Sequence, residues 1–210
     1  MASQGPNSPG TMADDATVGT VAWSNPDNAK ISDNVYTTTV LTASDSSHYL
    51  VATNFGFAIP TGATINGLLA EVEDKVDANG PFSFWGYAIK GGVVQTPRFA
   101  LGTITTTETY NSYGSSTDLW GETWTAEDIN ALDFGIVFQR GKSLTTTNTF
   151  SVDHIRITVY YTEAATGTNC QVNIGDAWKP IEAMQINIGD VWKPVASAKV
   201  NIGDDWKDIF

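Results

Sequence analysis

The 210-residue chain has one cysteine, two histidines and few basic residues, and each scarcity excludes a class of site. Cys170 is the single cysteine, so the chain can form neither an internal disulfide nor a cysteine-rich zinc site. Eleven basic side chains face 23 acidic ones, giving a formal net charge of -12. Phosphate backbones are held by clustered Lys and Arg, so we expect no nucleic-acid partner. No run approaches the 18 apolar residues of a membrane span, and we expect no membrane partner.

What the chain does contain favours strands. It has 27 Thr, 14 Ser and 19 Gly, while only 16% of its residues are charged. Long surface helices usually carry Glu, Lys and Arg, whereas Thr, Val, Ile and aromatic residues favour pleated strands. Seven Trp, seven Tyr and nine Phe can fill a sizeable core. The composition therefore predicts an all-β protein.

Composition divides the chain into an arm, a body and a repeat region. Residues 1–16 are rich in Gly, Pro, Asn and Ser and predict an extended N-terminal arm, either a disordered leader or a segment pinned to a neighbouring subunit. Residues 17–163 predict an antiparallel, jelly-roll-like β-sandwich of about eight strands separated by Gly, Pro and Asn turns. Residues 164–170 form a linker, and residues 171–210 hold the repeats.

The body also carries one helical signal. Thr125 is a suitable N-cap, Glu127 and Asp128 fall in the first turn, and Ile129 and Leu132 are expected to face inward. The helix would be one or two turns long. The strands that we expect around it cover residues 18–22, 36–41, 49–57, 65–76, 82–89, 102–110, 134–138 and 151–161.

Three repeats with a 14-residue step are the clearest feature of the sequence. The segment Val-Asn-Ile-Gly-Asp-Ala-Trp-Lys-Pro-Ile at 172–181 recurs with small changes at 186–195 and 200–209. A Gly-Asp pair between two short apolar runs fits a type II′ turn, so each repeat predicts one hairpin and the three predict a small hairpin meander. Such a unit cannot bury a face alone and must stack on itself, on the sandwich or on another chain.

These repeats are the expected contacts with other chains of the oligomer or with a particle. A three-residue turn would place Trp178 on the face of Ile174 and a two-residue turn would not, and the sequence leaves both open. The contact residues that we expect are Trp178, Trp192, Trp206, Ile174, Ile188 and Ile202.

Few side chains in the sequence are candidates for catalysis. His154 lies on an expected strand and His48 at the start of another, so both are interpreted as structural or solvent-facing histidines rather than general bases. Cys170 has no positioned partner in its linker. Glu71 and Glu73 share one strand face and could form a glycosidase pair, but a solvated strand face is the favoured interpretation. We therefore expect no enzyme and no cofactor.

Two further groups of side chains could bind a ligand, one calcium and the other sugars. Aspartates in expected loops supply oxygen atoms for calcium but lack the spacing of an EF-hand, so no metal site is assigned; they are Asp14, Asp15, Asp27, Asp33 and Asp45. Tyr113, Trp120 and Trp124 lie among Gly, Ser and Thr and could stack on sugar rings. The alternative is that Trp120 and Trp124 cap the end of the sandwich over the short helix.

Several segments together carry a family resemblance: 19–26 (GTVAWSNP), 32–36 (SDNVY), 55–60 (FGFAIP), 62–67 (GATING), 118–121 (DLWG), 124–130 (WTAEDIN) and 151–161 (SVDHIRITVYY). They resemble a β-sandwich module of structural proteins from tailed bacteriophages and prophages. The Ile-Gly-Asp-x-Trp-Lys repeats are similar to short tandem repeats that end many phage tail and minor virion proteins. The resemblance covers nearly the whole chain beyond residue 16 and brings no catalytic residues with it.

The resemblance implies a non-enzymatic virion structural protein: a capsid decoration or head-fibre protein, or a neck or tail accessory protein. Its expected partners are other virion proteins and further copies of itself, with a trimer favoured. Residues 1–15 lack the basic region and apolar stretch of a signal peptide, so we expect assembly in the host cytoplasm and release by lysis or by a route that the sequence itself does not encode. The alternative is a carbohydrate-binding module or host-surface adhesin that contacts host glycans.

The distribution of charge indicates different roles for residues 1–169 and for the repeats. Residues 1–169 hold 17 of the 23 acidic and 7 of the 11 basic side chains, while residues 170–210 hold 6 and 4 and three of the seven Trp. An acidic surface keeps a protein soluble at high local density. We therefore expect the body to face solvent and the repeats to make contacts.

Overall fold

The computed structural model describes residues 1–42, 44–80, 82–100, 104–142, 146–164, 171–174, 177–180, 185–188, 191–195, 199–202 and 205–208. The chain divides into two compact units, Met1–Ala164 and Ala165–Phe210. Among the described residues, no helix is long and apolar enough to cross a membrane.

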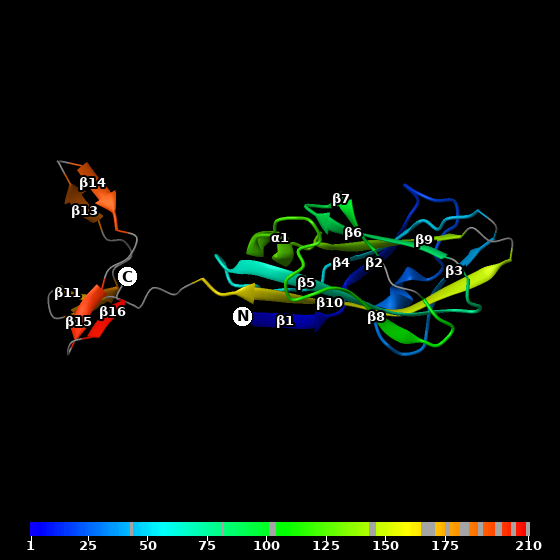
Figure 1. Ribbon diagram of the computed structural model, residues 1–210, viewed down its shortest axis with the longest axis horizontal. Coiled ribbons are helices and arrows are strands. Elements are labelled where there is room, and N and C mark those ends of the chain that lie inside the picture. The colour runs from blue at the N-terminus through cyan, green and yellow to red at the C-terminus, as the bar shows by residue number, and fades with distance from the viewer. Residues whose placement is uncertain are drawn as a thin grey trace. The chain divides into compact units, whose positions relative to one another are not determined.

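The first unit is a sandwich of two five-stranded antiparallel sheets (Figure 1). Sheet A consists of β1 (Ala2–Asn7), β3 (Thr37–Leu41), β5 (Thr64–Val76), β8 (Thr109–Gly114) and β10 (Asn148–Thr162). Its order is β1-β10-β5-β8, and β3 pairs with the first residues of β10. Sheet B consists of β2 (Thr11–Asp15), β4 (Tyr49–Thr53), β6 (Phe82–Lys90), β7 (Val93–Ala100) and β9 (Gly135–Lys142), in the order β2-β4-β9-β6-β7. The expected all-β antiparallel sandwich is confirmed.

Alternation along the strands builds the core between the sheets. In β5, Leu68, Ala70 and Val72 are buried, while Glu71 and Glu73 between them are only half-buried. Successive side chains of a strand point to opposite faces, so the apolar set of β5 faces sheet B and the charged set faces outward. The long strand β10 provides the matching inward face with Ile155, Ile157 and Val159, all fully buried.

One ion pair crosses this core. Asp74 of β5 and Arg140 of β9 form a salt bridge, and their side chains are 0% and 1% exposed. Asn111 donates to Asp74 Oδ1 at 2.6 Å, and the Arg140 guanidinium lies 3.5 Å from the centre of the Phe84 ring. Burial raises the pKa of Asp74 and lowers the pKa of Arg140, while the attraction between the two groups opposes both shifts. Each charge therefore depends on the other.

The N-terminal segment is part of the sandwich rather than a separate arm. β1 pairs with β10, with Ala2 opposite Tyr161, and β2 pairs with β4, with Asp15 opposite Tyr49. The segment is extended, as expected, but it lies on its own chain and adds an edge strand to each sheet. Its polar composition concealed this role, because an edge strand can have its backbone hydrogen bonds satisfied while burying little apolar surface.

Most of the expected strands are present, and the misses have local causes. Residues 18–22 form no strand; Val21 makes only an isolated bridge to Ser47. Residues 104–108 of the expected strand 102–110 are also irregular, and β8 begins at Thr109. β7 contains Pro97 and is absent from the strands expected from the sequence. As the last strand of sheet B, β7 can accommodate a proline that a central strand would exclude.

The expected helix is α1 (Ala126–Asn130). Thr125 and Asp128 form a reciprocal capping box, with 2.9 and 3.1 Å between the side-chain oxygens and backbone nitrogens. Ile129 is buried, as expected, but the inward position predicted for Leu132 is wrong, because its side chain is 73% exposed. The backbone is already extended at Ala131, so Leu132 lies beyond the helix and off its inner face.

In the second unit each repeat forms a hairpin, as predicted. The hairpins are β11 (Gln171–Ile174) with β12 (Ala177–Pro180), β13 (Gln185–Ile188) with β14 (Val191–Pro194), and β15 (Lys199–Ile202) with β16 (Asp205–Asp208). Ile174 pairs with Ala177 and Asn173 with Trp178, which is the register of a two-residue turn. Among the described strands each hairpin is its own two-stranded sheet, so the six strands do not form one continuous meander.

The ion pair in the core yields a test of stability. Replacing Asp74 by Asn leaves Arg140 buried without a counter-charge, so the free energy of unfolding should fall by about 3–5 kcal/mol in urea denaturation. As the control, Glu71→Gln breaks the partly exposed pair with Arg156 and should cost about 1 kcal/mol or less. The double variant Asp74→Leu/Arg140→Met should recover most of the loss. Equal losses in Asp74→Asn and Glu71→Gln would contradict the assigned role.

Candidate functional site

A polar cluster covers the outer face of sheet A. Its members come from the outward positions of β5, β8 and β10 and from the loops beside them: Ser8, Tyr36, Glu71, Glu73, Lys75, Glu108, Tyr110, Asp153, His154 and Arg156. The pairing of β5 with β10 shifts register between Val152 and His154. This irregularity brings the Asp153 carboxylate near Glu73, whereas strict alternation had placed Asp153 on the face opposite His154.

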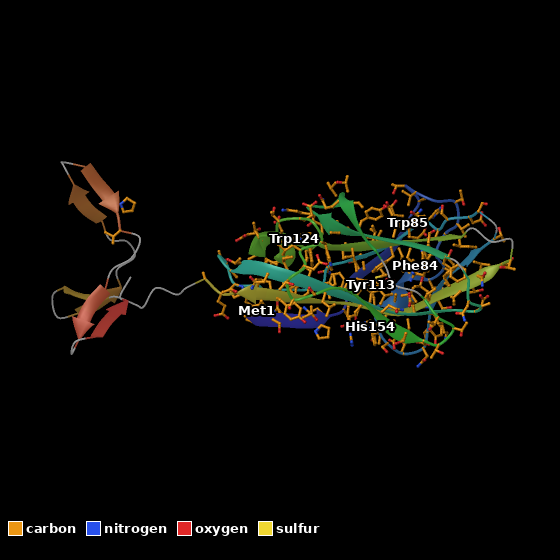
Figure 2. The ribbon with its side chains drawn as sticks, viewed as in Figure 1. Met1, Phe84, Trp85, Tyr113, Trp124 and His154 are labelled. Atoms are coloured by element: carbon orange, nitrogen blue, oxygen red, sulfur yellow. The ribbon has the colours of Figure 1, made fainter. Side chains whose placement is uncertain are left out.

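Both histidines are engaged with neighbours. His154, labelled in Figure 2, has Ser8 Oγ at 2.8 Å from Nε2 and the Tyr110 hydroxyl at 2.8 Å from Nδ1. Burial lowers the pKa of His154 below its ordinary value of 6.5. His48 Nδ1 lies 2.8 Å from Asp14 Oδ2. These contacts occupy both ring nitrogens of His154, which suits a structural histidine better than a general base.

The two glutamates weighed as a glycosidase pair have different surroundings. Glu71 receives two hydrogen bonds from Arg156, at 2.8 and 3.0 Å, and the guanidinium lies 3.8 Å from the centre of the Tyr110 ring. Oε2 of Glu73 is buried and has no hydrogen-bond partner in the described part of the chain. A retaining or inverting pair needs two carboxylates open to a substrate. Glu71 instead serves an ion pair.

Three carboxylates in this cluster lie close together. Glu73, Glu108 and Asp153 each place a carboxylate oxygen within 4.8 Å of the others. Glu108 Oε2 accepts from Lys75 Nζ at 2.8 Å and from the Tyr36 hydroxyl at 2.6 Å. Burial raises the pKa of Asp153, and the neighbouring Glu108 and Glu73 add to the shift. The three offer oxygen ligands of the kind that calcium takes, with Lys75 already compensating one of the charges.

The five aspartates expected in loops are not gathered into one site, and two of them, Asp14 and Asp15, lie in β2 rather than in a loop. Asp14 binds His48 and the Trp23 backbone, while Asp27 forms an ion pair with Lys30. The other three accept hydrogen bonds from backbone groups near them in sequence: Asp15 from Thr17, Asp33 from Val35, and Asp45 from Thr42. These carboxylates cap turns.

The aromatic residues assigned to glycan contact are buried, so that prediction is corrected. Tyr113, Trp120 and Trp124 are only 5%, 4% and 8% exposed. Trp124 donates from Nε1 to the Leu119 carbonyl at 3.0 Å, and its ring meets Phe134 edge-on at 5.3 Å. The alternative interpretation, packing at the end of the sandwich, accounts for Trp120 and Trp124. Tyr113 occupies an inward position of β8, where burial raises the pKa of its hydroxyl.

Other aromatic residues lie on the outer face of sheet B. Tyr49 of β4 and Tyr87 of β6 are half-buried and pack edge-on, with ring centres 5.9 Å apart. Trp85 of β6 lies over Gly141 of β9, where a Cβ atom would come within 2.9 Å of the indole ring. A sequence signal existed for this face. Phe82 and Phe84 alternate with Trp85 and Tyr87 along β6, so both sides of the strand are aromatic although only one faces the core.

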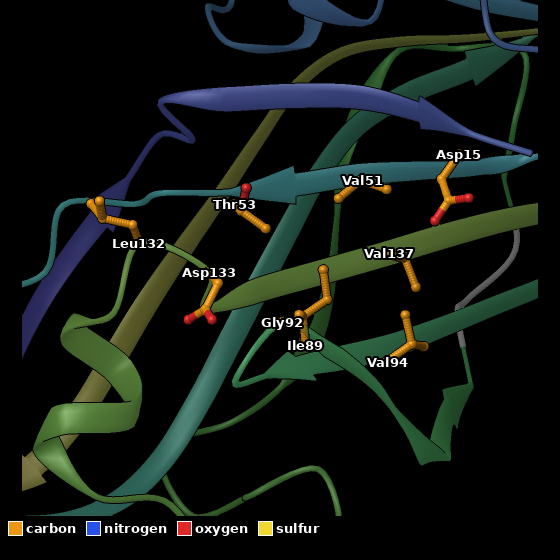
Figure 3. Close-up of a pocket in the computed structure, with 9 residues that line it drawn as sticks. All are labelled: Asp15, Val51, Thr53, Ile89, Gly92, Val94, Leu132, Asp133 and Val137. Carbon is orange, nitrogen blue, oxygen red and sulfur yellow. The ribbon is translucent and has the colours of Figure 1, made fainter. Parts of the chain in front are cut away.

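The same sheet carries a hollow of about 300 Å³, here called the sheet B hollow (Figure 3), and two of its lining residues, Asp15 and Val137, pair with Tyr49 and Tyr87. It is lined by Val51 and Thr53 of β4, Val137 of β9, Ile89 of β6, Val94 of β7, the turn residue Gly92, Leu132 and Asp133 beyond α1, and Asp15 of β2. No local pattern in the sequence indicates this hollow, because its lining comes from six separate segments. Its surface combines aliphatic side chains with carboxylates.

The expected contacts of the repeats are described at the level of the backbone. Each Trp pairs with an Asn of its own hairpin: Trp178 with Asn173, Trp192 with Asn187, and Trp206 with Asn201. Ile174, Ile188 and Ile202 end the first strand of each hairpin. The side chains of these residues lie outside what the structure describes, as does Cys170.

Comparison with known proteins places the chain in no family. No protein-family model matches, and no curated protein matches. Among solved structures, the chain is similar to one described as "CBM4 structure and function", with 12% sequence identity and a TM-score of 0.40 over 70% of this chain and 92% of that chain. A likeness this distant carries no inference about function.

The environment of His154 predicts a pH dependence. Because its pKa is lower in the folded than in the unfolded chain, the folded protein resists protonation, and this contribution to stability is lost as the pH falls below about 6.5. Between pH 7 and pH 5, the free energy of unfolding of the wild type should fall more than that of His154→Gln. Urea denaturation at both pH values measures this, with Tyr110→Phe as a control that keeps the imidazole. Equal falls would contradict the prediction.

Proposed function

We propose that this chain is a non-enzymatic structural protein of a tailed-bacteriophage virion, which docks on the particle and displays the β-sandwich. It would act as a capsid decoration or head-fibre protein, or as a neck or tail accessory protein. The observation that carries the proposal is the second unit, in which three near-identical hairpins follow one another at a 14-residue step. The resemblance of these repeats and of the sandwich motifs to phage structural proteins supports a location on a phage virion.

Short hairpins of this kind need a surface to rest on. Each has two four-residue strands, and among the described strands it pairs only within itself. An isolated two-stranded hairpin is marginally stable in water, and three or more paired strands or a packed face are usually needed. Equivalent repeats on several copies of the chain could supply that face to one another by symmetry. We therefore propose a homo-oligomer held by the hairpins, with a trimer as the expected stoichiometry.

The placement of the N-terminus favours the hairpins over the N-terminal segment as the docking element. β1 and β2 are edge strands of the two sheets, and Met12 of β2 is buried in the core. Releasing this segment to bind a particle would break the β1-β10 and β2-β4 pairings and expose part of the core. The hairpins could be engaged without changing the sandwich.

The alternative function was a carbohydrate-binding module or host-surface adhesin. The residues on which it rested, Tyr113, Trp120 and Trp124, are buried and cannot stack on a sugar without unfolding the end of the sandwich. Glycan recognition through these three residues is therefore not proposed.

The proposal can be tested on the full-length chain. Replacing Trp178, Trp192 and Trp206 together by Ala should convert the oligomer to the 22.5 kDa monomer in sedimentation equilibrium and abolish binding to particles that lack the protein. The matched control replaces three exposed apolar side chains of the sandwich, Ile31, Val35 and Val93, by Ala and should leave both properties intact. An oligomer and particle binding that survive the triple Trp variant would refute the role of the hairpins.

A further inference from the structure

The outer face of sheet B is organised in rows across its central strands. Val51, Val137 and Tyr87 are aligned in one row by the pairings of β4, β9 and β6. The next row holds Thr53, Gly135 and Ile89. Val137 is fully buried although it points away from the core, because neighbouring side chains on this outer face cover it. The outer face of sheet B is thus a packed apolar floor.

The two outer faces of the sandwich differ in what remains free to bind a ligand. On sheet A, most polar side chains bind one another, as in the contacts Ser8-His154-Tyr110 and Arg156-Glu71. On sheet B, the Asp133 carboxylate beside the hollow is exposed and has no hydrogen-bond partner in the described part of the chain. Asp15 accepts one bond from the Thr17 backbone through Oδ1. In the described part of sheet B, the carboxylates of Asp15 and Asp133 thus lie beside aliphatic side chains.

We infer that the sheet B hollow, together with Tyr49 and Tyr87, which pair with its lining residues Asp15 and Val137, is a binding site for neutral or amino-substituted saccharides. A pyranose ring has apolar C–H faces that pack against aromatic and aliphatic side chains, and hydroxyl groups that donate to carboxylates. Val51 and Val94, which are half-buried, supply the apolar contacts, while Asp15 and Asp133 supply the acceptors. A hollow of about 300 Å³ is at the small end of ligand sites and suits one or two sugar units.

The negative charge of the hollow favours neutral and amino saccharides over anionic ones. Among the described residues that line the hollow, both ionisable groups are carboxylates, and the whole chain has a formal charge of -12. Sialic acids, uronic acids and phosphorylated sugars would place a second negative charge against Asp15 or Asp133 and be repelled. A hexose or N-acetylhexosamine brings donors without charge, and a free amino sugar adds attraction. The same repulsion disfavours the phosphate headgroups of lipids.

The site lies within Met1–Ala164 and involves no residue of the hairpins. It therefore goes beyond the virion proposal: the sandwich could bind a sugar whether the protein sits on a capsid, a neck or a tail. The oligomer would then multiply weak single-site binding, since linked sites raise the effective concentration of the ligand.

The experiment screens the full-length protein on an array of neutral, amino and anionic saccharides and measures the hits by titration calorimetry. Binding should be confined to the neutral and amino classes. Val94→Asp introduces a charge into the hollow, and Tyr87→Ala removes the aromatic neighbour; each should abolish binding. Asp133→Asn should weaken binding about tenfold, because a hydrogen bond to a charged acceptor is replaced by a neutral one. This exposed substitution should not affect folding, which thermal melts would verify.

Two matched controls separate the site from general effects. Asp27→Asn removes a carboxylate that is 75% exposed outside the hollow, and Tyr160→Ala removes a half-buried tyrosine of sheet A. Both should bind like the wild type. The inference is overturned if the folded protein binds no neutral or amino saccharide, if it binds only anionic ones, or if Asp133→Asn and Val94→Asp bind unchanged. The triple Trp variant of the hairpins should keep single-site affinity, so a failure here and a failure of the virion proposal are distinguishable.

Discussion

The buried pair of Asp74 and Arg140 is the interaction on which the arrangement of the two sheets depends. It joins a central strand of sheet A to a central strand of sheet B inside a mainly apolar core. A one-residue slip of either strand would turn one charge outward and leave the other buried without its partner. Hydrophobic contacts tolerate small shifts, but a buried charge does not, because its desolvation is offset only by its partner. The pair therefore selects how β5 and β9 face each other across the core.

The two outer faces of the sandwich carry different kinds of side chains. Sheet A uses its outward positions for ion pairs and hydrogen bonds, including Arg156-Glu71 and Lys75-Glu108, and His154 is part of that network. Sheet B uses its outward positions for aromatic and aliphatic side chains around a hollow. Most described outward side chains of sheet A therefore contact one another, whereas outward side chains of sheet B border a hollow.

The sequence allowed the class of fold, most strands and the hairpins to be predicted, because strand alternation and Gly-Asp turns act over a few residues. Prediction from the sequence failed for features that depend on contacts between segments far apart in the chain. The polar residues 1–16 could be identified as edge strands only from the positions of β10 and β4, and β7 was concealed by Pro97. The exposure of aromatic residues is equally non-local: Trp120 is buried and Trp85 half-buried, although both have glycine and polar neighbours in the sequence. The hollow requires six segments, so no local pattern specifies it.

The pairing of Ala2 with Tyr161 has a consequence for the order of events during synthesis. β1 leaves the ribosome before the other strands of the sandwich, and it has no partner in sheet A until β10 emerges about 150 residues later. At roughly 5–20 residues per second, that edge waits on the order of ten seconds or more. The hairpins pair residues only three to nine positions apart and can close within microseconds of their emergence. Closure of sheet A must thus await almost the whole sandwich, whereas each repeat can form as soon as it is made.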